Sequence, residues 1–161
     1  MRLEDILDDY NNDTLSREQA IYTSFFVIQN RLQTSGEKAQ SELSMKKWLL
    51  LTIVSVCPKP HTLTNIGKMM GCSRQNVKKL ITLLETKGYI EIIEGTNNSL
   101  CIELTNKVQS YSNEIGFKQM KMLELLFSEF NDDQIKLFFN MIQKIFIGLE
   151  KVEKYVGDNN E

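Results

Sequence analysis

Apolar residues recur every three or four positions along most of the 161-residue chain, a pattern that predicts a protein built mainly from α-helices. The first helix is expected over about residues 15–32, with an apolar stripe formed by Ile21, Phe25, Ile28 and Leu32. A second helix, capped by Ser41 or Ser44, is apolar on nearly every side from Met45 to Val54. It must end at the CPKP segment, because proline lacks the N–H that continues a helix and restricts the residue before it.

The stretch from His61 to Ile93 predicts two short helices joined by a tight turn. Thr64 is expected to cap the first helix, Gly71 supplies a left-handed stop, and Ser73 caps the second helix. The second helix has one apolar face, formed by Val77, Leu80, Ile81 and Leu84. Its opposite face is polar and basic, formed by Gln75, Lys79, Thr82 and Thr86, with Lys78 beside them. This pattern is typical of a helix-turn-helix.

The sequence after this motif predicts a hairpin and two further helices. YIEII and LCIEL are β-branched runs on either side of a Gly-Thr-Asn-Asn turn, which indicates a β-hairpin. Thr105 can cap a long helix that runs to Phe130, and Asn131 with Asp132 begins the last helix. The last helix keeps an apolar stripe over about five turns, formed by Ile135, Phe138, Phe139, Ile142, Ile145, Phe146, Leu149 and Val152. A helix of the same chain could cover part of it, but pairing with a second copy is the more economical account.

Together these elements predict a fold that is mainly α with a small β-hairpin wing: a winged helix-turn-helix with N- and C-terminal dimerisation helices. Residues 1–40 form an acidic N-terminal segment and the first dimerisation helix. Residues 41–104 form the winged helix-turn-helix domain, and residues 105–161 form the C-terminal dimerisation helices with a short polar tail.

The net charge of −2 by itself argues against binding to nucleic acid, but the charges are unevenly distributed along the chain. Residues 61–90 carry five bases against one acid, whereas the flanking segments are acidic. Because phosphate binding depends on Lys and Arg, the middle of the chain is the part suited to nucleic acid. A short basic helix can also be no more than a solvated face, so charge alone leaves both interpretations open.

Several classes of site lack a signature in the sequence. Cys57, Cys72 and Cys101 are widely spaced and form no CxxC pair, which disfavours a disulfide framework or a zinc site. The single histidine, His61, is expected in an exposed loop and cannot by itself build a metal site or a catalytic triad. Phosphate-cradling glycine loops, secretory signals and membrane-length apolar runs are also absent. We therefore expect a cytoplasmic, non-enzymatic protein without cofactor or metal.

The segment LTNIGKMMGCSRQNVKKLITLLETKGYIEI resembles the MarR family of winged-helix regulators, and the order of elements matches over roughly Leu15 to Val152. The features that carry the resemblance are Leu63 and Thr64, Gly71, Ser73 to Gln75, and Leu84 to Ile90. The resemblance implies a dimer formed by the first and last helices, with recognition helices in successive major grooves and wings at adjacent minor grooves. It also implies a small-molecule effector pocket between the dimer helices and the winged domain.

The wing departs from the family pattern. The family's wing usually carries an Asp-x-Arg element, whereas here the segment IIEGTNNSLCIEL has no arginine and includes Glu91, Glu94 and Glu103. A strong cationic minor-groove contact is therefore not expected. Asn97 and Asn98 remain candidates for contact with the DNA backbone or a groove edge.

The DNA-binding residues are expected mainly near the start of the second motif helix. Ser73 and Arg74 sit at a helix N-terminus, which attracts phosphate. Gln75 and Asn76 can pair with adenine edges, and Lys79 can donate to guanine. The full predicted set is Thr64, Lys68, Ser73, Arg74, Gln75, Asn76, Lys78, Lys79, Thr82, Asn97 and Asn98. Simple solvent exposure is the alternative for each residue taken separately.

Cys72 precedes the cap of the second motif helix and lies near Arg74 in the sequence, which makes it a candidate redox-sensitive thiol. The alternative is a small buried cysteine, and this is favoured because the sequence offers no obvious resolving partner.

The residues and the resemblance together predict a sequence-specific regulator of transcription that binds double-stranded DNA. It is expected to act as a homodimer on a pseudo-palindromic operator, as a repressor in the commoner family pattern, with a small-molecule effector. The competing hypothesis is a winged-helix protein-interaction module, or the partner of another regulator, that has lost DNA binding. The acidic wing supports this second hypothesis.

Overall fold

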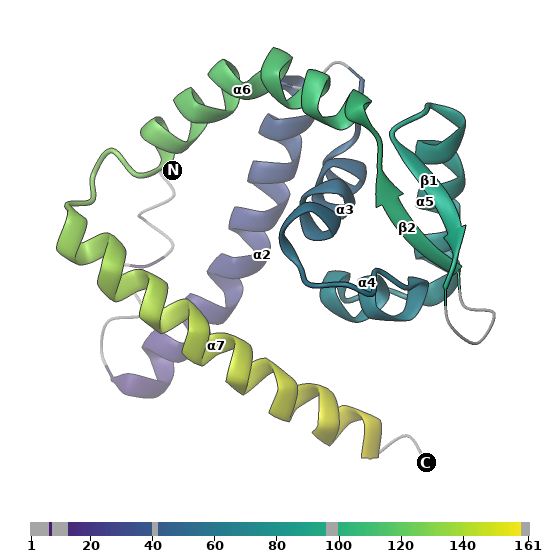
Figure 1. Cartoon of the computed structure of the whole chain (residues 1–161). Coiled ribbons are helices and arrows are strands. Elements are labelled where there is room, and N and C mark those ends of the chain that lie inside the picture. Colours follow the sequence, from purple (N-terminus) through teal and green to yellow (C-terminus); the bar gives the residue numbers. More distant parts are fainter. Residues whose placement is uncertain (1–6, 8–12, 40–41, 96–99, 159–161) are drawn as a thin grey trace. The chain divides into compact units, whose positions relative to one another are not determined.

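The computed structural model describes residues 7, 13–39, 42–95 and 100–158. Figure 1 labels the helices and strands of the chain. The chain divides into two compact units, Met1–Ile115 and Gly116–Glu161, each of which is described by itself. Within the described residues, no helix combines the length and apolar character that a membrane span requires.

Helix α2 (Thr14–Ala39) opens the described part of the first unit. Asp13 caps it, since Oδ1 accepts the Ser16 N–H at 2.9 Å and Oδ2 accepts the Ser16 hydroxyl at 2.8 Å. The backbone N–H of Ser16 is the main reason that the pKa of Asp13 lies below its usual value. The helix continues past Leu32, where the apolar stripe ends, because it packs closely on the next helix. A Cβ added at Gly36 would clash with Sδ of Met45.

Helix α3 (Met45–Val56) forms as predicted and supplies the centre of the core. Its buried residues are Leu50, Leu51, Ile53 and Val54. Ser44 is the N-cap residue, but its side chain makes no capping hydrogen bond, and Ser41 lies outside the described residues. The helix ends at Val56, and Cys57 is its C-cap residue, directly before the first proline, as predicted.

The helix-turn-helix consists of α4 (Leu63–Met70) and α5 (Arg74–Thr86). Gly71 has φ +61° and Ser73 Oγ accepts the Asn76 N–H at 3.3 Å, so both predicted turn features are confirmed. The predicted cap at Thr64 is wrong. Thr62 is the cap, with extended backbone and an Oγ1 that accepts the Asn65 N–H at 3.2 Å, because α4 begins early enough to bury Leu63.

The predicted hairpin consists of β1 (Ile90–Glu94) and β2 (Leu100–Leu104), which pair antiparallel. Ile92 lies opposite Ile102, and Ile102 is buried against the helices. Strand β2 is also joined to the corner segment, which we define as residues 57–62. The Ile102 N–H donates to the His61 carbonyl at 3.2 Å, and Thr62 forms an isolated bridge with Cys101.

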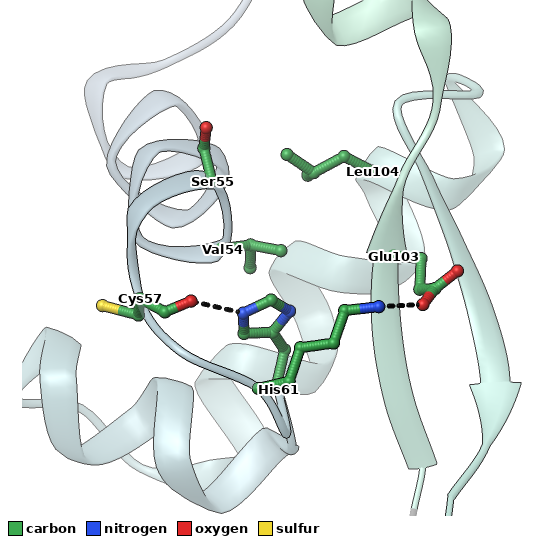
Figure 2. A pocket seen from close by; sticks show the side chains of 7 residues that line it. Val54, Ser55, Cys57, His61, Glu103 and Leu104 are labelled. Atoms are coloured by element: carbon green, nitrogen blue, oxygen red, sulfur yellow. Dashed lines mark hydrogen bonds and ion pairs between the residues drawn. The ribbon is translucent and has the colours of Figure 1, made fainter.

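His61 is not the exposed loop residue that the sequence predicted. Its side chain is only 8% exposed, and its Nε2 donates to the Cys57 carbonyl at 2.9 Å (Figure 2). The histidine is covered because β2 pairs with the corner segment, a contact between residues that lie about forty positions apart in the sequence. Local sequence signals could not reveal that contact.

Helix α6 (Asn106–Leu126) begins in the first unit and continues into the second. Thr105 Oγ1 accepts the Lys107 N–H at 3.3 Å, in agreement with the predicted cap. The expectation that this helix runs to Phe130 is wrong, since it ends at Leu126. Phe130 lies in the connection that follows and stacks on Phe138 with a centroid distance of 6.0 Å.

Helix α7 (Asp132–Asp158) makes up most of the second unit. Asn131 and Gln134 cap it reciprocally: the Gln134 N–H donates to Asn131 Oδ1 and the Asn131 N–H donates to Gln134 Oε1, both at 2.9 Å. No residue of α7 is buried. Its predicted apolar stripe therefore remains exposed in the second unit.

Candidate nucleic-acid interface

Helix α5 presents a polar, basic face to solvent because its opposite face is anchored in the core. Val77, Ile81 and Leu84 are buried against the hairpin and the neighbouring helices. The side chains that the sequence predicted to meet DNA from this helix are all exposed: Arg74, Gln75, Asn76, Lys78, Lys79 and Thr82. We call this set the α5 face.

The N-terminal end of α5 is arranged as an anion-binding helix end. The Asn76 N–H donates to Ser73 Oγ, and the Val77 N–H donates to the Ser73 carbonyl at 3.1 Å. The N–H groups of Arg74 and Gln75 precede the first intrahelical bond and therefore point out of the helix end. Together with the Arg74 guanidinium they can bind a phosphate oxygen.

Thr82 offers DNA less hydrogen-bonding capacity than its residue type suggests. Its hydroxyl donates to the Lys78 carbonyl at 3.1 Å, so the proton is used within the helix. What remains for a partner is an acceptor oxygen and the methyl group. The methyl group suits an apolar contact with a thymine methyl, whereas the oxygen can accept from an amino group.

The remaining predicted residues come from other elements. Thr64 and Lys68 are exposed on α4, which packs against α5, and Ser73 is exposed at the turn between these helices. Asn97 and Asn98 lie outside the described residues. The structure thus brings the α4 and α5 candidates into one motif.

The C-terminal end of α5 is held by residues that sequence reasoning missed. Lys107 Nζ, from the start of α6, donates to the Lys87 carbonyl at 3.0 Å and lies 4.6 Å from the centroid of the Tyr89 ring. Lys87 Nζ in turn donates to the Glu42 carbonyl at 3.0 Å. These contacts fix the C-terminal end of α5 to two segments that are distant in sequence.

Thr105 adds a further tie at the same place. Its hydroxyl donates to the Gly88 carbonyl at 2.7 Å, and Gly88 adopts φ +73° to make the sharp exit from the helix. Tyr89 follows and is fully buried, with its ring edge-on to Tyr111 at 5.6 Å. Burial raises the pKa of the Tyr89 hydroxyl above its usual range. No motif in the sequence signals this arrangement.

The described part of the hairpin is acidic, in agreement with the sequence. Glu91 lies directly opposite Glu103, and Glu94 is exposed at the end of β1. Glu103 forms an ion pair with Lys59 of the corner segment. The hydrogen bond from Lys59 lowers the pKa of the Glu103 carboxyl below its usual value.

The three cysteines are free and half-buried. Cys72 lies in the turn of the motif, where its N–H donates to the Gly67 carbonyl at 2.9 Å and its side chain packs against the core. Its redox role stays a prediction. In the part of the chain that the structure describes, no group of His, Cys, Asp or Glu side chains is arranged to hold a metal ion.

Sequence comparisons give no assignment: no protein-family model and no curated protein matches the chain. Solved structures do match. A MarR/EmrR family transcriptional regulator from Acinetobacter is 17% identical, with a TM-score of 0.73 over 83% of this chain and 97% of the other. Staphylococcus aureus MarR, in complex with salicylate and kanamycin, is 18% identical, with a TM-score of 0.69 over 83% and 93%.

The likeness extends to more distant organisms. The regulator BldR from Sulfolobus solfataricus is 13% identical and has a TM-score of 0.72 over 83% of this chain and 97% of its own. At such low identities the similarity establishes the fold. The chain has the MarR-type winged helix fold, mainly helical with an antiparallel two-stranded hairpin, as the sequence predicted.

Proposed function

We propose that this chain is a DNA-binding transcriptional regulator of the MarR type, which acts as a homodimer on a pseudo-palindromic operator. The observation that carries the proposal is the α5 face: a row of exposed polar and basic side chains on the second helix of a helix-turn-helix whose apolar side is buried. This is the placement that puts a recognition helix in a major groove. The MarR-type fold supports the same function.

The α5 face offers two kinds of contact. Ser73, Arg74 and Lys78, with Thr64 and Lys68 on α4, are suited to phosphate and set the position of the protein on DNA. Gln75 and Asn76 are suited to adenine edges, and Lys79 to guanine. Thr82 is suited to a thymine methyl group. Contact by Asn97 and Asn98 in the wing remains a prediction.

The apolar surfaces outside the winged module support a homodimer. Helices α2, α6 and α7 each expose large apolar side chains. On α7 these are Ile135, Leu137, Phe138, Phe139, Met141, Ile145, Phe146, Ile147, Leu149, Val152, Tyr155 and Val156. A surface of this extent is typical of an interaction site, and a second copy supplies a complementary helix by two-fold symmetry. Two recognition helices related in this way predict half-sites about 10 base pairs apart.

A small-molecule effector is part of the proposal. Two structural neighbours carry ligands: the Staphylococcus aureus protein is in complex with salicylate and kanamycin, and PcaV from Streptomyces coelicolor is in complex with its natural ligand. We infer that the present regulator acts in the cytoplasm and that a ligand alters its affinity for the operator. Repression is the mode of action that we propose.

A second candidate function is a winged-helix module that binds protein and no longer binds DNA. The acidic hairpin favours it, because the outward-facing carboxylates of Glu91 and Glu94 repel a phosphate backbone. The two functions differ in their dependence on ionic strength. DNA binding releases counterions and weakens steeply with salt, whereas a protein-only adaptor has no such DNA interaction to lose.

The test is selection of bound sequences from a randomised duplex pool, followed by titration of the enriched site. Gln75→Ala and Lys79→Ala are each expected to weaken binding by about 10-fold to 100-fold, which corresponds to a lost base contact of about 1–3 kcal/mol. Lys38→Ala removes an exposed lysine from α2 and serves as the matched control. An enriched inverted repeat is expected. A folded dimer that enriches no sequence at low salt contradicts DNA binding and favours the protein-binding module.

A further inference from the structure

A cavity of about 410 Å³ lies beside the corner segment, between the C-terminal end of α3 and strand β2. Figure 2 shows Val54 and Leu104 facing each other across it, with His61 and Glu103 at its base. Lys59 also lines it. The volume falls within the range of about 300–1,000 Å³ that small-ligand sites occupy. No residue of the α5 face lines this cavity.

His61 contributes an unused acceptor to the cavity. The Cys57 carbonyl can only accept, so the hydrogen bond of 2.9 Å places the imidazole proton on Nε2. In the neutral ring, Nδ1 then carries a lone pair, and Figure 2 shows it turned toward the Glu103 side of the cavity. Within the described part of the chain, Nδ1 has no hydrogen-bond partner, although the side chain is 92% buried (8% exposed).

Glu103 and Lys59 complete the polar base of the cavity. The ammonium of Lys59 bonds Oε1 of Glu103, which leaves Oε2 of the carboxylate as a second acceptor. Lys59 retains two further N–H donors. The base thus presents two acceptors, His61 Nδ1 and Glu103 Oε2, and the remaining N–H donors of Lys59, while the walls contributed by Val54 and Leu104 are aliphatic.

We propose that this cavity binds a small uncharged molecule that carries two hydroxyl groups. One hydroxyl donates to His61 Nδ1 and the other donates to Glu103 Oε2, while a hydroxyl oxygen accepts from Lys59 Nζ. The carbon skeleton of the ligand packs between Val54 and Leu104. An anion is a poorer fit, because its oxygens have no proton to offer Nδ1 and are repelled by the Glu103 carboxylate.

The position of the cavity gives the ligand a route to regulation, an extension that rests on the proposed DNA-binding function. His61 belongs to the corner segment that leads into α4, and Glu103 belongs to the hairpin. The Lys59–Glu103 pair and the Ile102-to-His61 hydrogen bond already join these two parts. A diol bonded to both His61 and Glu103 adds a further tie and so restricts the hairpin relative to the helix-turn-helix.

His61 is the only histidine in the sequence, so the binding test can observe the site directly. The ¹⁵N signals of its imidazole are recorded by NMR on the full chain during titration with catechol and with myo-inositol. These probes distinguish an aromatic diol from a carbohydrate-like one. Cyclohexanol, which has one hydroxyl, and acetate, which is an anion, are the comparison compounds. We expect saturable movement of the Nδ1 signal with at least one diol and much weaker responses to cyclohexanol and acetate.

Glu103→Gln provides the decisive variant, and Glu91→Gln is its matched control. Glu91 lies directly opposite Glu103 on the hairpin but does not line the cavity. Glu103→Gln is expected to weaken diol binding about tenfold, because an acceptor for a charge-assisted hydrogen bond is lost. Glu91→Gln should leave binding unchanged. Circular dichroism checks that both variants fold.

The possible outcomes test the ligand site separately from the proposed DNA-binding function. No movement of the Nδ1 signal with either diol, tighter binding of acetate, or equal loss in both variants overturns the site. These measurements are made without DNA, so their result does not depend on whether the α5 face binds DNA. If a diol binds as expected and the operator affinity measured in its presence is unchanged, the regulatory extension is overturned while the site remains.

Discussion

Helices α5 and α7 carry the same kind of amphipathic pattern, with apolar residues three and four positions apart, but their apolar side chains differ in burial. On α5 the apolar side chains are enclosed, with Val77 and Leu84 at 0% exposure. On α7 the corresponding side chains stay open, with Phe139 at 61% and Phe146 at 62% exposure. The difference lies in their neighbours.

Helix α5 finds its partners within the first unit, where its apolar residues share one core with residues of α3, α4, the hairpin and the start of α6. Its apolar face is buried in the core, and its polar face is exposed to solvent. Within the described residues of the second unit, taken by itself, helix α7 has no comparable cover. The same spacing of apolar residues can therefore mark a helix face buried in the core or a face open to a partner. The two cases can be told apart only when it is known which residues pack on that face.

Leu84→Ala is expected to give the largest effect, because it opens a cavity in the core beneath α5. Truncation of a fully buried leucine costs about 3 kcal/mol in the free energy of unfolding, within a range of about 2–5 kcal/mol. Chemical denaturation measures the loss. Leu83→Ala is the matched control, since Leu83 is the adjacent residue and is exposed. Equal losses in the two variants contradict the burial pattern of α5.

Phe146→Asp tests the other side of the comparison. A charge in the apolar stripe of α7 should weaken self-association at least about 100-fold, because it buries a carboxylate without a partner in the proposed interface. Sedimentation equilibrium gives the dissociation constant. Asn140→Asp places the same charge on α7 outside the stripe and should leave association intact. A dimer that survives Phe146→Asp argues that α7 is not its interface.

Substitution of alanine for two glycines, one in each unit, is expected to change the free energy of unfolding in opposite directions. A Cβ at Gly67 would lie 2.8 Å from the Cys72 carbonyl oxygen, whereas a Cβ at Gly148 of α7 meets nothing within 4 Å. Gly67→Ala should therefore destabilise the fold by about 1–3 kcal/mol through steric conflict, despite the better helix propensity of alanine. Gly148→Ala should stabilise α7 by up to about 1 kcal/mol. Thermal unfolding of both variants measures the signs, and stabilisation by Gly67→Ala contradicts the close turn.

The smallest change in stability is expected on removal of the exposed Lys59–Glu103 ion pair. The pKa of Glu103 is lower in the folded chain than in the unfolded chain, so the pair stabilises the fold above the ordinary carboxyl pKa. This contribution disappears as the pH falls through the lowered pKa. Glu103→Gln should therefore unfold slightly more easily than the wild type near pH 7, with the difference vanishing once the pH falls below the lowered pKa of Glu103. A difference that grows in acid contradicts the ion pair.

Local signals predicted the winged module well. The left-handed Gly71, the cap at Ser73 and the apolar spacing of α5 each depend on residues within a few positions, and the structure has all of them. The same reasoning placed the polar candidates of α5 on an exposed face. Whether these side chains bind DNA stays a prediction, because their exposure gives them access to a partner without identifying it.

The errors occurred where contacts join distant parts of the chain. Thr62, and not Thr64, caps α4 because Leu63 must reach the core. Seen from the sequence, His61 lies beside a proline in a loop, yet strand β2 covers it. The residues that hold the C-terminal end of α5, Glu42 and Lys107, come from segments with no recognisable motif.

The sequence by itself determined which segments are helices, where the turn and hairpin lie, and which face of each helix is apolar, because these properties follow from backbone preferences and from the spacing of neighbouring residues. The tertiary structure decided which apolar faces are covered, that His61 is buried and bonded through Nε2 to the Cys57 carbonyl, and that a cavity forms between the corner segment and the hairpin. Burial and cavity formation depend on packing between segments far apart in the chain, and no local pattern specifies that packing.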